Sequence, residues 1–249
     1  MRGDRPIQIH LIDSPETSKR KFMFTNGARS VPDVVQTGYS VDIGKYLGEG
    51  WEVFKKNAGG FVGFTLIMLL VSIIPQVLPE RIKPLGSIAS SVLSGPLGAG
   101  FYIVAFKLMK QRATTFSDFF RGFNHFLPLF LASLVTGILT LIGFALFVLP
   151  GIYLAVAWMF TTPFIVDRKF DFWDAMESSR KVISRNWFSW FIFLIVLALL
   201  NFVGFLLFGL GALVTIPLSA CAVAIAYQEV MGLSNSGIAD EGAGITDSF

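Results

Sequence analysis

Histidine and carboxylate side chains are the groups that could carry out catalysis in this chain, and none is placed to do so. The two histidines, His10 and His125, lie in a polar N-terminal stretch and at the edge of an apolar run. No histidine or carboxylate falls inside an apolar run, so an intramembrane metalloprotease or aspartyl protease would lack its metal ligands or its acid and base. A serine there would have no base to activate it. We therefore expect a protein that is not an enzyme, with no catalytic residue, metal or cofactor.

Asp171, Asp174 and Glu177 lie close together in the sequence. Three carboxylates could hold a cation. Alternatively they form the solvated acidic start of a helix, where the helix dipole favours negative charge, and we favour that interpretation. Cys221 is the single cysteine, which excludes an internal disulfide. Its small neighbours indicate a packing role.

Apolar runs long enough to cross a membrane dominate the chain from residue 57 onward. Hydrophobic residues make up 53% of the 249 residues and charged residues 15%, whereas soluble domains carry about 25% charged residues. The stretches without Asp, Glu, Lys or Arg are 57–79, 84–106, 126–166 and 187–228. A spanning helix needs ~20 apolar residues, so the first two stretches hold one span each and the last two hold a hairpin each. The sequence predicts an all-α integral membrane protein with six transmembrane helices in three hairpins.

The turns of the two long stretches can be placed from glycine and proline. In the last stretch we expect the turn at Gly209-Leu210-Gly211, because glycine ends a helix at little cost. The third stretch offers Gly143 or Pro150-Gly151. A turn at Pro150 would leave a short second helix, so we favour Gly143, with Pro150 in the first turns of the fourth helix, where proline is tolerated.

A weak three-fold repeat accompanies the hairpins. Short amphipathic leaders end at Asn57, Asn124 and Asn186, with an aromatic residue shortly after each. The second helix of each hairpin carries a proline followed by small residues, and these prolines are Pro96, Pro150 and Pro217. The alternative is that every hairpin needs a connector and the likeness is accidental.

The leaders have the apolar spacing of helices. Phe116, Phe119, Phe120 and Phe123 follow the i, i+3, i+4, i+7 pattern, and residues 43–54 and 172–183 show similar apolar faces. Such amphipathic helices lie in the membrane interface with the aromatic face toward the lipid. We therefore expect three interfacial helices.

Basic residues are distributed very unevenly. Eighteen of the 20 Lys and Arg residues lie before the first span or in the second-to-third and fourth-to-fifth connections. The positive-inside rule then places both termini in the cytoplasm. We expect flexible cytoplasmic tails at residues 1–40 and 232–249, a membrane domain at 41–231, and no cleavable signal peptide.

The basic residues beside the spans could contact anionic lipid head groups, which attract each nearby Lys or Arg by about 1 kcal/mol. The alternative is that they only set topology. The candidate head-group contacts are Lys107, Lys110, Arg112, Arg121, Arg180, Lys181 and Arg185. The dispersed charge makes no case for nucleic-acid binding, so membrane lipid is the expected partner, and the sequence leaves any protein partner unknown.

Ionisable residues are absent from the spans, which argues against ion-coupled transport. Polar residues within them are Gln76, Thr136, Thr140 and Asn201. We expect Asn201 to join two helices by a hydrogen bond, with contact to a substrate as the alternative.

Residues 149–181 resemble a known family. Leu-Pro-Gly-Ile-Tyr at 149–153 is followed by Thr-Pro-Phe-Ile-Val at 162–166 and Ala-Met-Glu-Ser-Ser-Arg-Lys at 175–181. Bacterial multi-pass membrane proteins of unknown function show similar motifs, and so does the membrane domain attached to some glycerophosphoryl diester phosphodiesterases. The resemblance spans about residues 45–231. It implies a six-helix fold in a bacterial inner membrane without catalytic residues, since the phosphodiesterase barrel is absent.

Two hypotheses for function follow. In the first, the chain is a non-enzymatic membrane protein that contacts phospholipid or scaffolds a membrane partner. The alternative is a transporter or channel for an uncharged or amphipathic solute. A polar cavity lined by Asn201, Thr136 or Gln76 would favour transport, and a centre filled by Phe, Leu and Ala would count against it.

Overall fold

The computed structural model describes residues 27–206 and 209–240, all of them in helices or in the loops between helices. Within these ranges, six helical segments are long and apolar enough to cross a membrane. Their bounds are Ala58–Val77, Lys83–Met109, Phe116–Leu146, Val148–Arg168, Trp187–Leu206 and Ala212–Met231. The prediction of an all-α, six-pass membrane protein is therefore confirmed.

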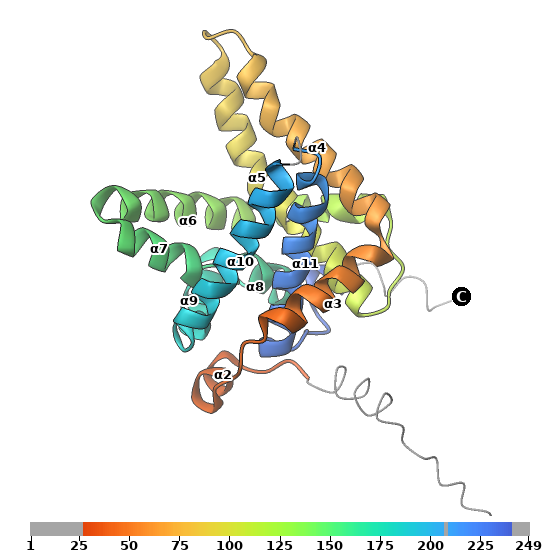
Figure 1. Cartoon of the computed structure of the whole chain (residues 1–249), viewed down its shortest axis with the longest axis vertical. Helices are drawn as coiled ribbons and strands as arrows, with labels where there is room; N and C mark the ends of the chain where they lie inside the picture. The colour runs from red at the N-terminus through yellow and green to blue at the C-terminus, as the bar shows by residue number, and fades with distance from the viewer. Residues whose placement is uncertain (1–26, 207–208, 241–249) are drawn as a thin grey trace, which may run out of the picture.

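The spans form three hairpins (Figure 1). Helix α4 (Ala58–Val77) pairs with α5 (Lys83–Met109), α6 (Phe126–Leu146) pairs with α7 (Val148–Ala157), which continues into α8 (Thr161–Arg168), and α10 (Trp187–Leu206) pairs with α11 (Ala212–Met231). The second span of each hairpin is the inner one. In its most apolar stretch 44–50% of the residues are buried, against 17–22% in the first span.

A leader precedes each hairpin, as predicted. The leaders are α3 (Ile43–Lys56), the 3-10 helix η1 (Phe116–His125) and α9 (Phe172–Ser184). Each leader packs against the second span of the preceding hairpin: η1 on α5, α9 on α7 and α8, and α3 on α11. The last pairing closes a circle, because it joins the first leader to the last span. A connector would need to contact only its own hairpin, so this cyclic arrangement supports a true three-fold repeat.

Small residues bring each leader close to its inner helix. A Cβ added at Gly50 of α3 would lie 2.8 Å from the backbone nitrogen of Ala222 in α11. A Cβ added at Gly122 of η1 would lie 2.2 Å from the Pro96 carbonyl oxygen of α5. In α9 the corresponding residue is Ser179, whose hydroxyl donates to the Ala157 carbonyl at 2.7 Å. A small residue of each leader thus approaches one inner span closely, at Ala222, Pro96 and Ala157.

The inner helices also end alike. Gln111 after α5, Lys169 after α8 and Gly232 after α11 have φ of 56°, 54° and 66°. A residue of positive φ is a common helix C-cap, and glycine is preferred there. The three ends therefore share a positive φ, although Lys169 is in the left-handed region and Gly232, with a ψ of 151°, is not.

The hairpin turns agree with the sequence at one place and differ at the other. Gly209 has a φ of 76° and lies in the turn before α11, as predicted. The other hairpin turns at Phe147, after the predicted Gly143 and before Pro150. Gly143 does not turn the chain; it lets the helices meet, since a Cβ there would lie 2.9 Å from the Gly151 nitrogen.

The leaders pack against protein more than the sequence led us to expect. Tyr46, Phe119 and Met176, which belong to the three apolar faces, are almost completely buried. One aromatic residue of each leader stays exposed, and these are Trp51, Phe116 and Trp173. The apolar faces therefore mainly cover the inner helices, and the position of the leaders in the membrane interface stays a prediction.

The described parts of the expected tails pack against the leaders and the inner helices. Residues 29–40 form a strap that includes α2 (Val31–Thr37), and the Arg29 amide donates to the Met231 carbonyl at 2.7 Å. Residues 233–240 form a cap that ends in the 3-10 helix η2 (Ile238–Asp240), which contacts α5 and α8. Residues 1–26 and 241–249 lie outside the described residues.

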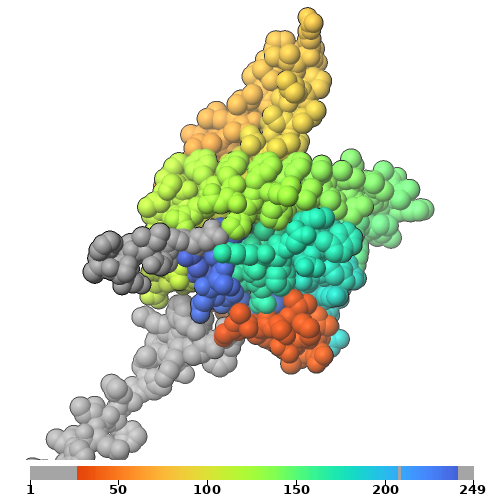
Figure 2. Space-filling view, turned by 180° about the vertical axis from the view of Figure 1, so that it is seen from behind, coloured from red at the N-terminus to blue at the C-terminus, as the bar shows by residue number. Residues whose placement is uncertain are grey.

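Two regions of different character result. The leaders, the strap, the cap and the adjoining ends of α5, α8 and α11 form a packed base. The rest of each hairpin is an arm, and the α4–α5 and α6–α7 arms extend in different directions from the base (Figures 1 and 2). Apolar side chains at the arm ends are exposed, including Val77, Leu149 and Phe205. This distribution suits arms that lie in lipid.

Candidate functional site

The seven basic residues proposed as head-group contacts fall into two groups. Lys107, Lys110, Arg112 and Arg121 lie at the end of α5 and on η1, whereas Arg180, Lys181 and Arg185 lie on or just after α9.

In the first group every basic residue faces a carboxylate. Lys107 Nζ and Arg121 Nε each lie 2.7 Å from a different oxygen of Asp118. Lys110 and Arg112 both pair with Asp240 of the cap. These cations are therefore ion-paired within the base.

The α9 group is more accessible. Arg180 holds Glu177 through two bonds of 2.7 and 2.8 Å, and Lys181 lies 3.4 Å from the same carboxylate. The hydrogen bond from Arg180 lowers the pKa of Glu177. Arg185 is exposed, and the described residues include no carboxylate paired with it. Arg180 and Lys181 thus share one carboxylate on this surface, and Arg185 adds a third cation.

The three carboxylates near the start of α9 do not converge. Asp174 is exposed in the first turn of α9, and Glu177 points to Arg180. No group of three metal-ligating side chains occurs within the described ranges. The geometry matches an acidic helix start.

Hydroxyl and aromatic groups adjoin the α9 cations. Tyr153 of α7 shares a hydrogen bond of 2.9 Å with Ser184, and its hydroxyl also interacts with Arg180. Trp187 stacks on Tyr153 with ring centroids 6.1 Å apart, and its buried indole nitrogen has no hydrogen-bond partner among the described residues. We call Tyr153, Arg180, Lys181, Ser184 and Arg185 the α9 cluster. It gathers cations and hydroxyls, which are groups from which a phosphate can accept hydrogen bonds.

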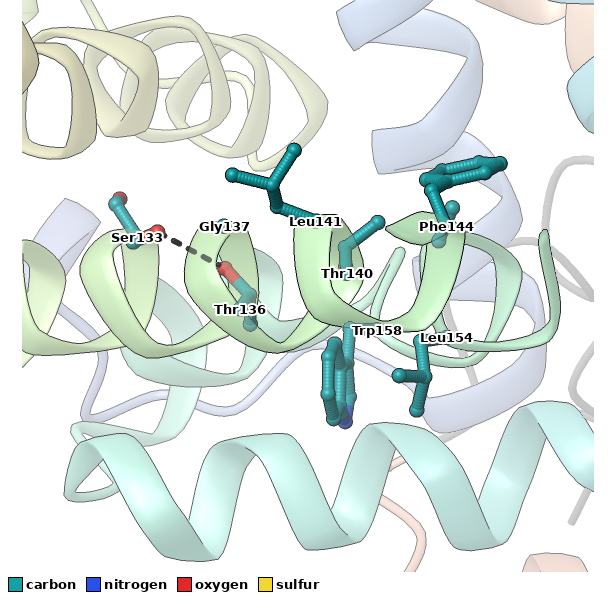
Figure 3. A pocket seen from close by; sticks show the side chains of 9 residues that line it. Ser133, Thr136, Gly137, Thr140, Leu141, Phe144, Leu154 and Trp158 are labelled. Atoms are coloured by element: carbon teal, nitrogen blue, oxygen red, sulfur yellow. Dashed lines mark hydrogen bonds between the residues drawn. The ribbon is translucent and has the colours of Figure 1, made fainter. Parts of the chain in front are cut away.

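An open groove of about 460 Å³ runs along the α6–α7 arm (Figure 3). Its lining residues are Ser133, Thr136, Gly137, Thr140, Leu141, Phe144, Leu154, Ala155 and Trp158. The Ser133 and Thr136 hydroxyls donate to the carbonyls of Leu129 and Ala132 in their own helix, at 2.9 and 2.6 Å. Because these hydroxyls are satisfied, the groove presents a mainly apolar surface.

The fourth span is interrupted between a residue that lines the groove and the helix α9 that carries the cluster. Ser179 of α9 donates to Ala157 and accepts from the Phe160 amide at 3.1 Å. Trp158, which lines the groove, lies between these two residues, and Arg180 follows Ser179 directly. The interruption of the helix frees backbone groups, and Ser179 satisfies them while fixing α9 beside the groove.

The centre of the molecule is filled by aromatic rings. Tyr227 of α11 contacts Phe106, Phe160 and Phe164 at centroid distances of 5.1–5.7 Å, and Phe160 packs edge-on against Trp190 at 4.9 Å. These residues come from all three hairpins. The inner helices therefore meet through apolar packing.

The polar residues of the spans are dispersed. Asn201 of α10 donates to Ser219 of α11 at 2.7 Å, which confirms its predicted interhelical bond. Thr136 lines the side groove, and Gln76 is exposed near the end of its arm. None of them lines a cavity in the aromatic centre.

The sequence analysis missed the buried carboxylates Asp118 and Asp167 and the partly buried Asp240. Asp167 accepts from Tyr227 at 3.0 Å and from the Ser234 amide at 2.8 Å. Each lies beside an apolar run or in the expected tail, so exposure was the natural assumption. Arg121 and Arg168 lie close in the sequence to Asp118 and Asp167, whereas no basic residue follows Arg185, so the sequence held no such signal for Asp240.

No family model, curated protein or solved structure matches this chain. The resemblance to bacterial membrane proteins of unknown function therefore stays a prediction. The structure shows a multi-pass helical membrane protein.

Proposed function

We propose that this membrane protein is not an enzyme and that it binds phospholipid, with the head group at the α9 cluster and one acyl chain in the α6–α7 groove. The observation that carries the proposal is at Ser179, the neighbour of Arg180, which bonds the backbone on both sides of Trp158, a residue that lines the groove. A phospholipid has the same sequence of chemical groups, an anionic phosphate followed by apolar chains.

The two halves of this site contribute differently. Acyl chains in a bilayer are already in an apolar medium, so binding of a chain in the groove depends on shape complementarity and gains little hydrophobic free energy. Lys181 and Arg185 are exposed and can each attract an anionic head group by about 1 kcal/mol. We therefore expect preference among lipids to follow head-group charge.

The aromatic centre supports this proposal over transport of an uncharged solute. A transport path needs polar groups along its length, and the inner helices meet through Phe106, Phe160, Phe164 and Tyr227. We also propose a bacterial inner membrane as the location. The packed base, which carries most of the Lys and Arg residues, would then face the cytoplasm, because anionic lipid and positively charged loops coincide on that side.

Native mass spectrometry of the purified protein tests the proposal. We expect wild-type protein to retain phospholipid and the double variant Lys181→Ala, Arg185→Ala to retain several-fold less anionic lipid. The matched control is Lys55→Ala, Lys56→Ala, which removes two exposed cations from the α3 leader. Equal loss in both double variants would show a general charge effect and contradict a specific site.

A further inference from the structure

Lys110, Arg112 and the Gly237 amide surround the carboxylate of Asp240. Lys110 Nζ lies 2.6 Å and Arg112 Nη1 2.5 Å from the two carboxylate oxygens, and the Gly237 amide donates at 3.0 Å. The lysine also donates to the Ser234 carbonyl. Two cations and a backbone N–H around one anion form the donor arrangement that binds phosphate in proteins.

The two cations are held in position by the end of α5. Gln111 adopts a φ of 56°, and the Arg112 amide donates back to the Lys107 carbonyl at 2.9 Å. This cap turns the chain sharply, so residues 110 and 112 both reach the same carboxylate. The cation side of the site therefore belongs to the rigid inner helix.

The surrounding charges leave an excess of positive charge. Asp118 is shared by Lys107 and Arg121, just as Asp240 is shared by Lys110 and Arg112. Asp167 interacts with both Lys110 and Arg168, so among the described residues five cations face three carboxylates. A phosphate dianion in place of Asp240 would balance more of this charge.

The anion side is carried by a different and smaller element. Asp240 lies on η2, a turn of three residues in the cap, and Ile238 and Ala239 hold this turn against α5 and α8. Release of the turn would expose one large apolar side chain and free both cations. The cap can therefore exchange with an external anion without any change in the spans.

We propose that Lys110 and Arg112 form a phosphate-binding seat that the chain's own Asp240 occupies in this structure. The ligand is a phosphate monoester group, carried by a lipid head group or free in solution. The seat is separate from the α9 cluster, so cap release would add a second anion site to the base.

Asp240→Asn is the main test, because it removes the competing charge while keeping the size of the side chain. Asp174→Asn is the matched control, since Asp174 is an exposed carboxylate on α9 outside the seat. By titration calorimetry in neutral detergent, we expect Asp240→Asn to bind inorganic phosphate about tenfold more tightly than wild type or the control. Lys110→Ala in the Asp240→Asn background should abolish the gain.

A second experiment identifies the source of the phosphate. The same variants, placed in phosphatidylcholine vesicles with and without phosphatidic acid, should show whether a lipid phosphate reaches the seat. Ile238→Ala keeps Asp240 but loosens the turn, and it should raise phosphate affinity if Asp240→Asn fails to fold. Increased binding of phosphate in the calorimetry or in the vesicle experiment supports the seat. Unchanged affinity in both experiments for every folded variant overturns it. Loss of lipid on changing Lys181 and Arg185 is scored independently, so either site can fail alone.

Discussion

At the scale of single residues, identical glycines in one leader have opposite roles. Gly50 and Gly48 both lie in α3, yet only Gly50 faces the backbone of α11. A Cβ at Gly50 would lie 2.8 Å from the Ala222 nitrogen, whereas Gly48 has nothing within 4 Å. Gly50 allows close packing of α3 on α11, whereas Gly48 only lowers the helix propensity of α3.

Alanine at the two positions should therefore change stability in opposite directions. We expect Gly50→Ala to destabilise the protein by about 1–3 kcal/mol through overpacking. Gly48→Ala should stabilise it by about 0.5–1 kcal/mol through helix propensity. Thermal unfolding in detergent, followed by circular dichroism, measures both. Similar shifts for the two variants would contradict the close approach of α3 to α11.

The candidate site shows what residue types alone can predict. The cations were found from sequence, because Lys and Arg beside apolar runs mark the membrane border. Their partners were not found, since Asp240 pairs with Lys110 across 130 positions in the chain. Separations of this size are set by the fold and leave no local pattern.

At the scale of elements, the strap is clamped to the third hairpin through Tyr39. Its hydroxyl donates to the Val182 carbonyl at 2.6 Å and accepts from Trp190 Nε1 at 2.8 Å. Asn186 donates to the Tyr39 carbonyl at 2.6 Å. Burial raises the pKa of Tyr39 to about 12.

This raised pKa makes the strap sensitive to alkali. The unfolded chain ionises Tyr39 near pH 10 and the folded chain near pH 12, so the folded state loses stability as pH rises between them. We expect wild type to be more stable than Tyr39→Phe by about 1–2 kcal/mol at pH 8. That advantage should shrink by about 1 kcal/mol at pH 11. Thermal unfolding at both pH values checks this, and a constant difference would count against the buried phenol.

Elements were predictable where a local signal sets them. Long charge-free runs placed all six spans, and glycines placed the turn at Gly209–Gly211. The turn at Phe147 was missed because Gly143 and Gly151 are used for helix contact. Sequence alone does not distinguish a glycine that breaks a helix from one that lets helices touch.

At the scale of the whole molecule, the cyclic contact of leader and inner helix explains how divergent arms stay together. Each leader joins its own hairpin to the preceding one, and α3 on α11 closes the set. The arms can then separate into lipid because the base carries the cohesion. The sequence suggested the repeat through Asn57, Asn124 and Asn186, but the order of contacts required the structure.

The same architecture predicts that all arm ends lie on one side of the membrane and the base on the other. Arg81 lies at the exposed end of the α4–α5 arm and Leu210 at that of the α10–α11 arm, whereas Asn235 is exposed on the cap. Cysteine placed at each position reports its side, because the natural Cys221 is buried.

We expect a membrane-impermeant maleimide to label Arg81→Cys and Leu210→Cys from outside spheroplasts. Asn235→Cys should react only after the membrane is permeabilised, since the Lys and Arg residues of the packed base favour the cytoplasmic side. Wild type, with Cys221 alone, controls for background labelling. If Asn235→Cys reacts from outside while the two arm ends do not, the orientation is reversed. If Arg81→Cys and Leu210→Cys react from opposite sides, the hairpins do not each cross the membrane twice, and the cyclic base would have to span it.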